Sequence, residues 1–308
     1  MSSEGAGVSE LPLTATLLSE VFPGSPVASV EYLRWLYLQS PFGPVIETNL
    51  DDDRGRAGHY ALVPITIARD GRDYRAALSL NTAVHERARG GGVFVGLGGA
   101  TIDDAAASGV ETVVGVANAN STPGFVKRLG FELLAPLPAD VMVPVPGTRS
   151  GISSRDVDDG SLDDVLGSDT ESLLAVPEHG EARRWTPETL AWRLRRPGAS
   201  YAVHRGPEVL AVTCHDHRAG LRVAIILKVF ASSPLRGSQA RALVRAACRH
   251  HRAPVALHAG FNDLVSFRGI ALPKRLRASP LNLIYRSLVT PARGASVARF
   301  EFLDFDAY

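Results

Sequence analysis

Three consecutive glycines, Gly90, Gly91 and Gly92, follow Arg89 in the stretch HERARGGGVFVGLGGA. The apolar run LSLNTAVH before them predicts a strand, and the run VFVGLGGATIDDAAAS after them predicts a helix that ends at Gly109. A glycine turn at a helix N-terminus presents backbone N–H groups without Cβ atoms in the way, and the helix dipole favours negative charge there. This arrangement predicts phosphate binding, with a plain tight turn as the alternative.

Two other phosphate-binding motifs fit this stretch poorly. No Lys-Ser or Lys-Thr pair follows the glycines, which excludes a P-loop. A dinucleotide fingerprint requires Gly or Ala where Thr101 stands after Gly96 and Gly98. It also requires an acidic residue about 20 residues further on, and Asp103 and Asp104 come too early. An oxidoreductase with an unusual dinucleotide loop is therefore only the third hypothesis for the function.

Two histidines on predicted strands, His59 and His85, are candidate general bases, because histidine has the usual pKa closest to neutral pH. Asn81 is a third candidate catalytic residue, and with Glu47 and Ser79 it could relay a proton through water. The alternative for both histidines is a structural role, with His59 bonded inside the sheet and His85 on the surface.

The run Cys214-His215-Asp216-His217 has the residue types of a metal site. On a strand, however, successive side chains point to opposite faces, so the four side chains cannot converge on one ion. We predict no metal.

A polar stretch near the C-terminal end, GFNDLVSFRGIALPKRLRASP, could line a pocket for a phosphorylated acceptor. An ordinary charged loop is the alternative. The candidate substrate-binding residues are Asn262, Asp263, Arg268, Lys274, Arg275 and Arg277.

Helices and strands alternate along the first half of the 308-residue chain, which predicts a mixed α/β layer architecture. Patterning predicts helices at 28–40, 92–108 and 123–130 and strands at 59–68, 74–85, 111–118 and 131–145.

The second half repeats this order, and one segment repeats in detail. EYLRWLYLQSP and ETLAWRLRRP place Glu, Leu and Trp at matching offsets, and we predict that Trp35 and Trp192 are core anchors. The repeat indicates two related halves. We predict a disordered N-terminus at 1–11, a first domain at 12–143, a linker at 144–165 and a second domain at 166–308.

The composition is that of a soluble globular protein, with 45% hydrophobic and 21% charged residues and a formal net charge of +1. It lacks the basic excess typical of nucleic-acid or membrane-surface binding, so we expect neither partner. No apolar run approaches the roughly 18 residues of a membrane span, and the first residues are acidic rather than basic. Two cysteines fit a reducing compartment, and we expect a cytoplasmic protein.

Taken together, these segments resemble the GNAT superfamily of acyl-CoA-dependent N-acyltransferases. The family's Q/R-x-x-G-x-G/A turn is similar to residues 89–94, with Phe94 in the final place. NTAVHERARGGG resembles the family's strand end, and VANANSTPGFVKRLGF resembles its second cofactor motif. The resemblance covers roughly 28–143. The second half resembles a degenerate copy, because its turn has the single glycine Gly237.

The resemblance implies a central, mostly antiparallel twisted sheet with flanking helices, in two related halves. It implies acetyl-CoA or another acyl-CoA as co-substrate, bound by backbone and side-chain groups at the ends of the strands and at the glycine turn. These residues are Ala83, Val84, Arg89, Gly90, Gly91, Gly92, Val93, Phe94, Asn118, Asn120 and Phe125.

The implied reaction is direct attack of a small-molecule amine on the thioester, catalysed mainly by placement and by donors aimed at the oxyanion. The acceptor amine could belong to a nucleotide-linked amino sugar or a specialised metabolite, and a homodimer is left open. Many family members have a tyrosine acid where Val126 stands. The main alternative is therefore a catalytically inactive CoA-sensing or interaction module.

Overall fold

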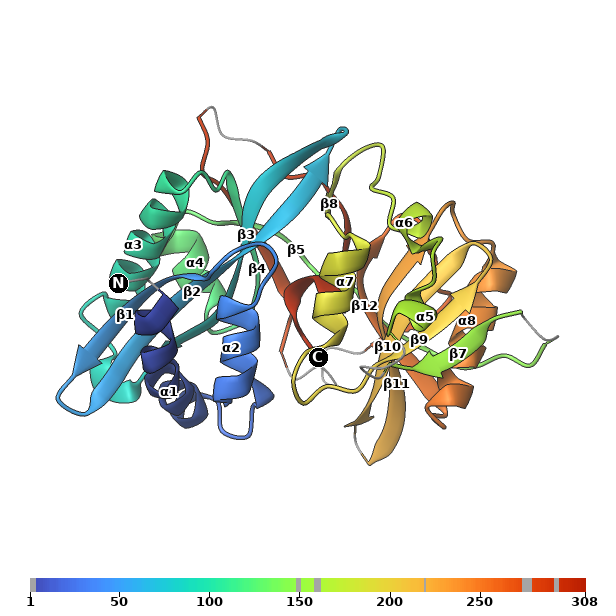
Figure 1. Ribbon diagram of the computed structural model, residues 1–308, viewed down its shortest axis with the longest axis horizontal. Helices are drawn as coiled ribbons and strands as arrows, with labels where there is room; N and C mark the ends of the chain where they lie inside the picture. The colour runs from blue at the N-terminus through green and yellow to red at the C-terminus, as the bar shows by residue number, and fades with distance from the viewer. Residues whose placement is uncertain (1–3, 148–150, 158–161, 219, 273–278, 291–293) are drawn as a thin grey trace.

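The computed structural model describes residues 4–147, 151–157, 162–218, 220–272, 279–290 and 294–308. Figure 1 shows the two halves of the chain side by side, with C-terminal segments between them. The first half contains α1 (Glu4–Val21), η1 (Pro26–Ala28), α2 (Val30–Leu38), β1 (Ile46–Asp52), β2 (Gly55–Arg69), β3 (Arg72–Val84), η2 (Glu86–Ala88), α3 (Val93–Ala107), β4 (Thr112–Ala117), α4 (Thr122–Arg128), β5 (Glu132–Pro136) and β6 (Ala139–Met142).

The second half follows a similar order after a short strand. It contains β7 (Ser153–Asp156), α5 (Leu162–Leu166), α6 (Thr170–Leu173), β8 (Glu181–Arg183), α7 (Pro187–Leu194), β9 (Ala202–Gly206), β10 (Val209–Arg218), β11 (Leu221–Ala231), α8 (Gly237–His250), β12 (Val255–Asn262), β13 (Ile270–Ala271), β14 (Asn282–Ser287), β15 (Val297–Glu301) and η4 (Phe302–Phe305).

The strands form one twisted sheet in which each half receives a strand from the other. β14, from the end of the chain, lies antiparallel between β4 and β5, and β6 pairs antiparallel with β12. Most pairings among the described strands are antiparallel, with β3–β4, β11–β12 and β8–β15 parallel. The predicted mixed α/β fold with a mostly antiparallel sheet is confirmed.

Helices cover both faces of the sheet, and the period-2 pattern of β2 explains why. Tyr60 and Leu62 pack against α3 and α4, whereas Ala61 and Val63 pack against α1 and α2. The second half repeats this layering, because alternate residues of β10 face α7 on one side and α8 on the other. The first half thus has a separate core on each face of its sheet.

The repeated tryptophans meet where the two halves join. The rings of Trp35 in α2 and Trp192 in α7 stack with centroids 4.5 Å apart and planes 14° apart. Trp35 Nε1 also donates to the carbonyl of Trp192 at 3.2 Å. Trp35 is buried, as predicted for a core anchor, and Trp192 is partly buried. The matched helices therefore pack against each other.

Three predicted boundaries differ from the structure. α1 begins at Glu4, so the stretch predicted as disordered is helical from that residue on. The predicted strand at 131–145 is divided into β5 and β6, which pair with different strands, β14 and β12. The segment predicted as a linker, 144–165, contains β7, which pairs with β9. None of the described helices is long and apolar enough to cross a membrane.

Candidate functional site

The candidate site lies where β3 and β4 separate. Their parallel pairing runs from Ala76 and Thr112 to Ser79 and Gly115, and both strands continue beyond it. The register between β2 and β3 shifts after the bonded part, and Asn81 there has a left-handed φ of 54°. A bulge of this kind bends its strand away from a neighbour. A cavity of about 580 Å³ occupies the space between the separated ends.

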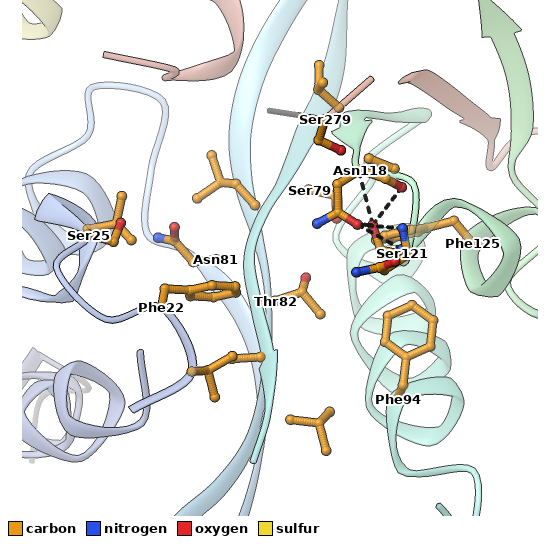
Figure 2. Close-up of a pocket in the computed structure, with 18 of the residues that line it drawn as sticks. Phe22, Ser25, Ser79, Asn81, Thr82, Phe94, Asn118, Ser121, Phe125 and Ser279 are labelled. Atoms are coloured by element: carbon orange, nitrogen blue, oxygen red, sulfur yellow. Dashed lines mark hydrogen bonds between the residues drawn. The ribbon is translucent and has the colours of Figure 1, made fainter. Parts of the chain in front are cut away.

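The cavity opens on both sides of the end of β3. Figure 2 shows Phe22, Ser25 and Asn81 on one side of the strand and Phe94, Phe125 and Asn118 on the other. The described lining residues are Val21, Phe22, Ser25, Val27, Ser79, Leu80, Asn81, Thr82, Ala83, Val84, Arg89, Phe94, Val116, Ala117, Asn118, Asn120, Ser121, Phe125, Ser279, Pro280 and Leu281.

The glycine turn lies at the N-terminus of α3. Gly90, Gly91 and Gly92 have φ values of 95°, 56° and 80°, and Gly92 is the N-cap of the helix. A Cβ added to any of them would meet no atom within 4 Å. The left-handed backbone, rather than crowding, is therefore what calls for glycine. The open space in front of the helix N-terminus fits a bound anion.

Several predicted cofactor-binding residues line the cavity together. They come from the end of β3, the turn before α3 and the turn before α4: Ala83, Val84, Arg89, Phe94, Asn118, Asn120 and Phe125. Gly90, Gly91, Gly92 and Val93 form the turn and the first residue of α3 instead. The rings of Phe94 and Phe125 meet edge to face at 5.3 Å and hold α3 against α4.

Asn118 also has a structural task. Its Oδ1 accepts hydrogen bonds from the backbone N–H groups of Asn120 and Ser121, both at 2.9 Å. These bonds shape the turn that begins α4. The predicted contact with the cofactor arm therefore depends on the Asn118 amide nitrogen or on Asn120.

Thr82 carries an unsatisfied polar atom in the cavity lining. Its Oγ1 is buried and has no hydrogen-bond partner among the described residues. Buried hydroxyls without a partner are uncommon and costly. A ligand with an amide group in this cavity would supply the missing partner.

His59 is completely buried and does not line the cavity. Its Nε2 lies 2.9 Å from Tyr37 Oη and its Nδ1 lies 2.7 Å from Asn49 Oδ1. Burial, together with the charge of Arg56, lowers the pKa of His59 to about 3. A ring with this pKa is a weak base, and both of its nitrogens already have partners.

The other proposed proton carriers are spread around His59. Asn81 lines the cavity and donates from Nδ2 to Tyr37 Oη at 3.2 Å. Glu47 Oε2 lies 3.4 Å from His59 Nδ1, and burial raises the pKa of Glu47. Ser79 lines the cavity and donates to Tyr60 Oη at 3.2 Å.

His85 lies outside the described cavity lining. Its Nδ1 accepts the backbone N–H of Arg87 at 3.2 Å, and its Nε2 is 3.6 Å from Glu20. The ring therefore caps the short helix η2.

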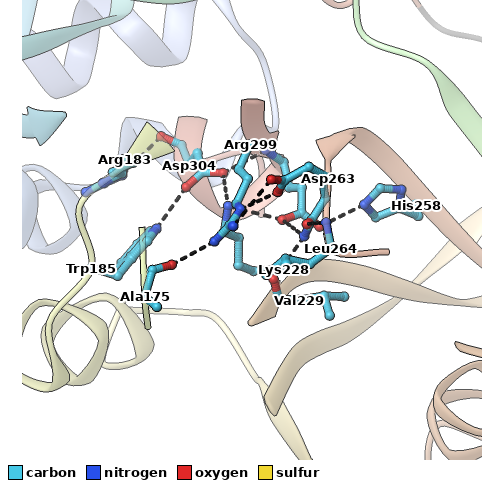
Figure 3. A network of polar contacts seen from close by, with 12 residues as sticks. Ala175, Arg183, Trp185, Lys228, Val229, His258, Asp263, Leu264, Arg299 and Asp304 are labelled. Atoms are coloured by element: carbon cyan, nitrogen blue, oxygen red, sulfur yellow. Dashed lines mark hydrogen bonds and ion pairs between the residues drawn. The ribbon is translucent and has the colours of Figure 1, made fainter. Parts of the chain in front are cut away.

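The predicted substrate-binding residues that the structure describes, Asn262, Asp263 and Arg268, do not line the cavity. Asn262 donates to the Val229 carbonyl and to Glu301, at 3.0 and 2.9 Å, and Asp263 is paired with Arg299 (Figure 3). Arg268 is exposed. Lys274, Arg275 and Arg277 lie outside the described residues.

Sequence reasoning missed several residues of the site. Phe22, Ser25 and Val27 come from the end of α1 and from η1, far from the glycine turn in sequence. Tyr37 lies in α2, the helix whose sequence is repeated in α7. Periodicity alone predicts that its aromatic ring is a core residue. Thr82 follows the bulge, and nothing in a strand pattern marks a bulge.

The run from Cys214 to His217 shows the alternation that was expected on a strand. Cys214 packs in the apolar core, and burial raises the pKa of its thiol to about 12, whereas His215 and His217 are exposed. Among the described residues, no group of three or more His, Cys, Asp or Glu side chains is placed to hold a metal ion.

Solved structures provide the comparison with known proteins. No protein-family model and no curated protein sequence matches the chain. A probable N-acyltransferase from Enterococcus faecalis is 16% identical with a TM-score of 0.64, and the match covers 94% of this chain and 71% of that one. A GCN5-related N-acetyltransferase from Anabaena variabilis is 11% identical with a TM-score of 0.61, again covering 94% and 71%.

A third structure is the N-myristoyltransferase of Saccharomyces cerevisiae with bound myristoyl-CoA. It is 12% identical with a TM-score of 0.57, and the match covers 94% of this chain and 81% of that one. These likenesses extend over nearly the whole chain at low sequence identity. They confirm the resemblance seen around the glycine turn at the level of the fold, and this chain has the fold of the GNAT N-acyltransferases.

Proposed function

We propose that this protein is an acyl-CoA-dependent N-acyltransferase that transfers an acetyl or short acyl group to the amine of a small molecule. The observation that carries the proposal is the cavity between the separated ends of β3 and β4, with the open glycine turn beside it. The cavity is the place for the acyl-bearing arm, and the glycine turn is the place for the phosphate groups.

The chain's own groups divide into two tasks. The backbone N–H groups at Gly92 and the first turn of α3 bind the pyrophosphate, supported by the helix dipole. Backbone groups of Ala83 and Val84 and the hydroxyl of Thr82 bind the amide-containing arm and orient the acyl group. Acyl-CoA supplies the activated thioester carbon.

The reaction exchanges one bond for another. The amine nitrogen forms a bond to the acyl carbon, the carbon–sulfur bond breaks, and the proton lost by the amine balances the charge of the thiolate. Val126, at the position of the family's usual tyrosine acid, is exposed on α4. A thiol with a pKa of about 8.5 leaves as a thiolate without a dedicated acid.

The acceptors to test first are nucleotide-linked amino sugars and small amine metabolites. Calorimetric titration with acetyl-CoA, and release of free CoA thiol in the presence of each amine, tests the proposal. Binding and thiol release that depends on the amine support the enzyme. Binding without transfer to any amine supports the CoA-sensing module instead, and no binding rejects both.

A further inference from the structure

Asn81 lies where the cavity meets a buried polar network. It lines the cavity on the side of Phe22 and Ser25, across β3 from Phe94 and Phe125 (Figure 2). Its left-handed φ of 54° belongs to the bulge, a conformation that asparagine tolerates better than most residues. Its side chain is therefore held at the opening through the sheet by the backbone.

The network determines which end of the Asn81 amide faces the cavity. The Asn49 Oδ1 atom only accepts, so His59 donates to it from Nδ1, at 2.7 Å. His59 Nε2 is then unprotonated and accepts a hydrogen bond from the Tyr37 hydroxyl, at 2.9 Å. The Tyr37 oxygen in turn accepts from Asn81 Nδ2, at 3.2 Å. Asn81 Oδ1 is the end left for a ligand.

The cavity that Asn81 lines has apolar as well as polar side chains in its wall. Phe22, Val27 and Leu80 line the same cavity, and Arg89 is the one charged side chain among its described lining residues. Arg89 lies beside the glycine turn, and its Nε is 3.4 Å from the Val84 carbonyl. The Asn81 side of the cavity thus combines a hydrogen-bond acceptor with the apolar side chain of Phe22 and the hydroxyl of Ser25.

We infer that the acceptor is a primary amine on an alkyl or aryl body, that Asn81 Oδ1 accepts a hydrogen bond from this amine, and that Tyr37 and His59 are positioning residues for Asn81. The inference rests on the proposed function. The apolar body packs against Phe22 and Val27, while the amine points through the opening in the sheet. Without Tyr37, the Asn81 amide turns freely and presents its nitrogen part of the time.

The test uses the full chain, acetyl-CoA and phenylethylamine as the probe acceptor. The variant Tyr37→Phe removes the hydroxyl that orients Asn81. Its matched control, Tyr285→Phe, removes another buried hydroxyl of the first-half sheet, one bonded to Thr112 at 2.9 Å. We expect Tyr37→Phe to raise the KM for phenylethylamine about fivefold, with kcat and the Kd for acetyl-CoA nearly unchanged. The control should match wild type in all three.

A second variant distinguishes loss of the Asn81 side chain from loss of the fold. Asn81→Gly keeps the left-handed backbone without strain and removes the amide. We expect it to raise the KM for phenylethylamine about tenfold without lowering Tm. It decides the question if Tyr37→Phe proves unstable.

The outcomes distinguish failure of the inference about the acceptor from failure of the proposed function. A KM for phenylethylamine that is equal to the wild-type value in Asn81→Gly overturns the inference, as does a wild type that acetylates glucosamine and not phenylethylamine. Loss of acetyl-CoA binding in the wild type itself overturns the proposed function, and this inference with it.

Discussion

The two halves of the molecule each contain a pair of parallel strands whose pairing ends before the strands do, and the described residues that follow the last pairs differ between the halves. The last paired residues are Ser79 and Gly115 in β3 and β4, and Ile226 and His258 in β11 and β12. In the first half the space beyond them is the cavity. In the second half β15 pairs with β12, and η4 packs against β11.

The residues at one matched position differ in chemistry between the two halves. Asn81 stands two positions after the last paired residue of β3, and Lys228 stands two positions after that of β11. Lys228 Nζ lies 2.6 Å from Asp304 and 3.1 Å from Glu301, and all three are buried (Figure 3). Burial acts to raise the pKa of Glu301, but Lys228 and His258 outweigh it, and the pKa is lowered.

The N-termini of α3 and α8 also differ between the two halves. Three glycines precede α3, whereas α8 begins at Gly237 after Arg236, whose backbone N–H donates to Gln239 Oε1 at 2.8 Å. A helix start that is capped by its own side chain has fewer free donors for an anion. Similar strand geometry is thus combined with a cavity in the first half and with a buried ion-pair network in the second.

Among the substitutions, the largest effect is expected at Lys228 in the second half. Lys228→Met leaves the buried carboxylates of Glu301 and Asp304 without their cation, and we expect a loss of about 3 to 5 kcal/mol in the free energy of unfolding. Urea denaturation measures it. A loss below about 1 kcal/mol would show that this network does not hold the second half closed.

Acid should destabilise both halves through buried neutral histidines. Burial lowers the pKa of His59 to about 3, of His204 to about 3 and of His251 to about 4, with neighbouring charges adding to it. The unfolded chain takes up these protons near pH 6.5, so stability falls as the pH drops below that value. At about pH 5 each ring lowers the free energy of unfolding by roughly 2 kcal/mol relative to neutral pH.

Thermal unfolding between neutral pH and about pH 4 checks this prediction. His59→Gln should reduce the slope of Tm against pH, because one of the three buried rings no longer contributes to it. An identical slope would assign the acid sensitivity to other groups.

A carboxylate at the glycine turn should weaken cofactor binding. Gly92→Asp places negative charge at the N-terminus of α3, and we expect the Kd for acetyl-CoA to rise about tenfold to a hundredfold. Gly71→Asp is the matched control, since Gly71 also has a left-handed φ, 74°, and open space around it. Equal affinities in the two variants would remove the glycine turn from the site.

The smallest effect is expected at the corresponding turn of the second half. Gly237→Asp should leave both the Kd and the stoichiometry at the wild-type values, with one acetyl-CoA per chain, because the space beyond β11 and β12 is filled. Calorimetry gives both numbers. A second bound acetyl-CoA in the wild type would show that the second half also has a site for it.

Local features of the site could be predicted from the sequence. The glycine run, the apolar strand before it and the periodic helix after it determine a turn at a helix N-terminus, because each acts over a few residues. The repeat around Trp35 and Trp192 likewise indicated two related halves, although not that the rings stack.

Only the tertiary structure decided which of these features share a site. The exchange of β6 and β14 joins segments from the two halves of the sequence, and no local pattern encodes such pairing. The same holds for His59, which long-range packing buries, and for Asn262, which bonds to Glu301 and to the Val229 carbonyl. Local residue types determine secondary structure and turns, whereas burial, pKa and cavity shape depend on contacts that form only in the folded chain.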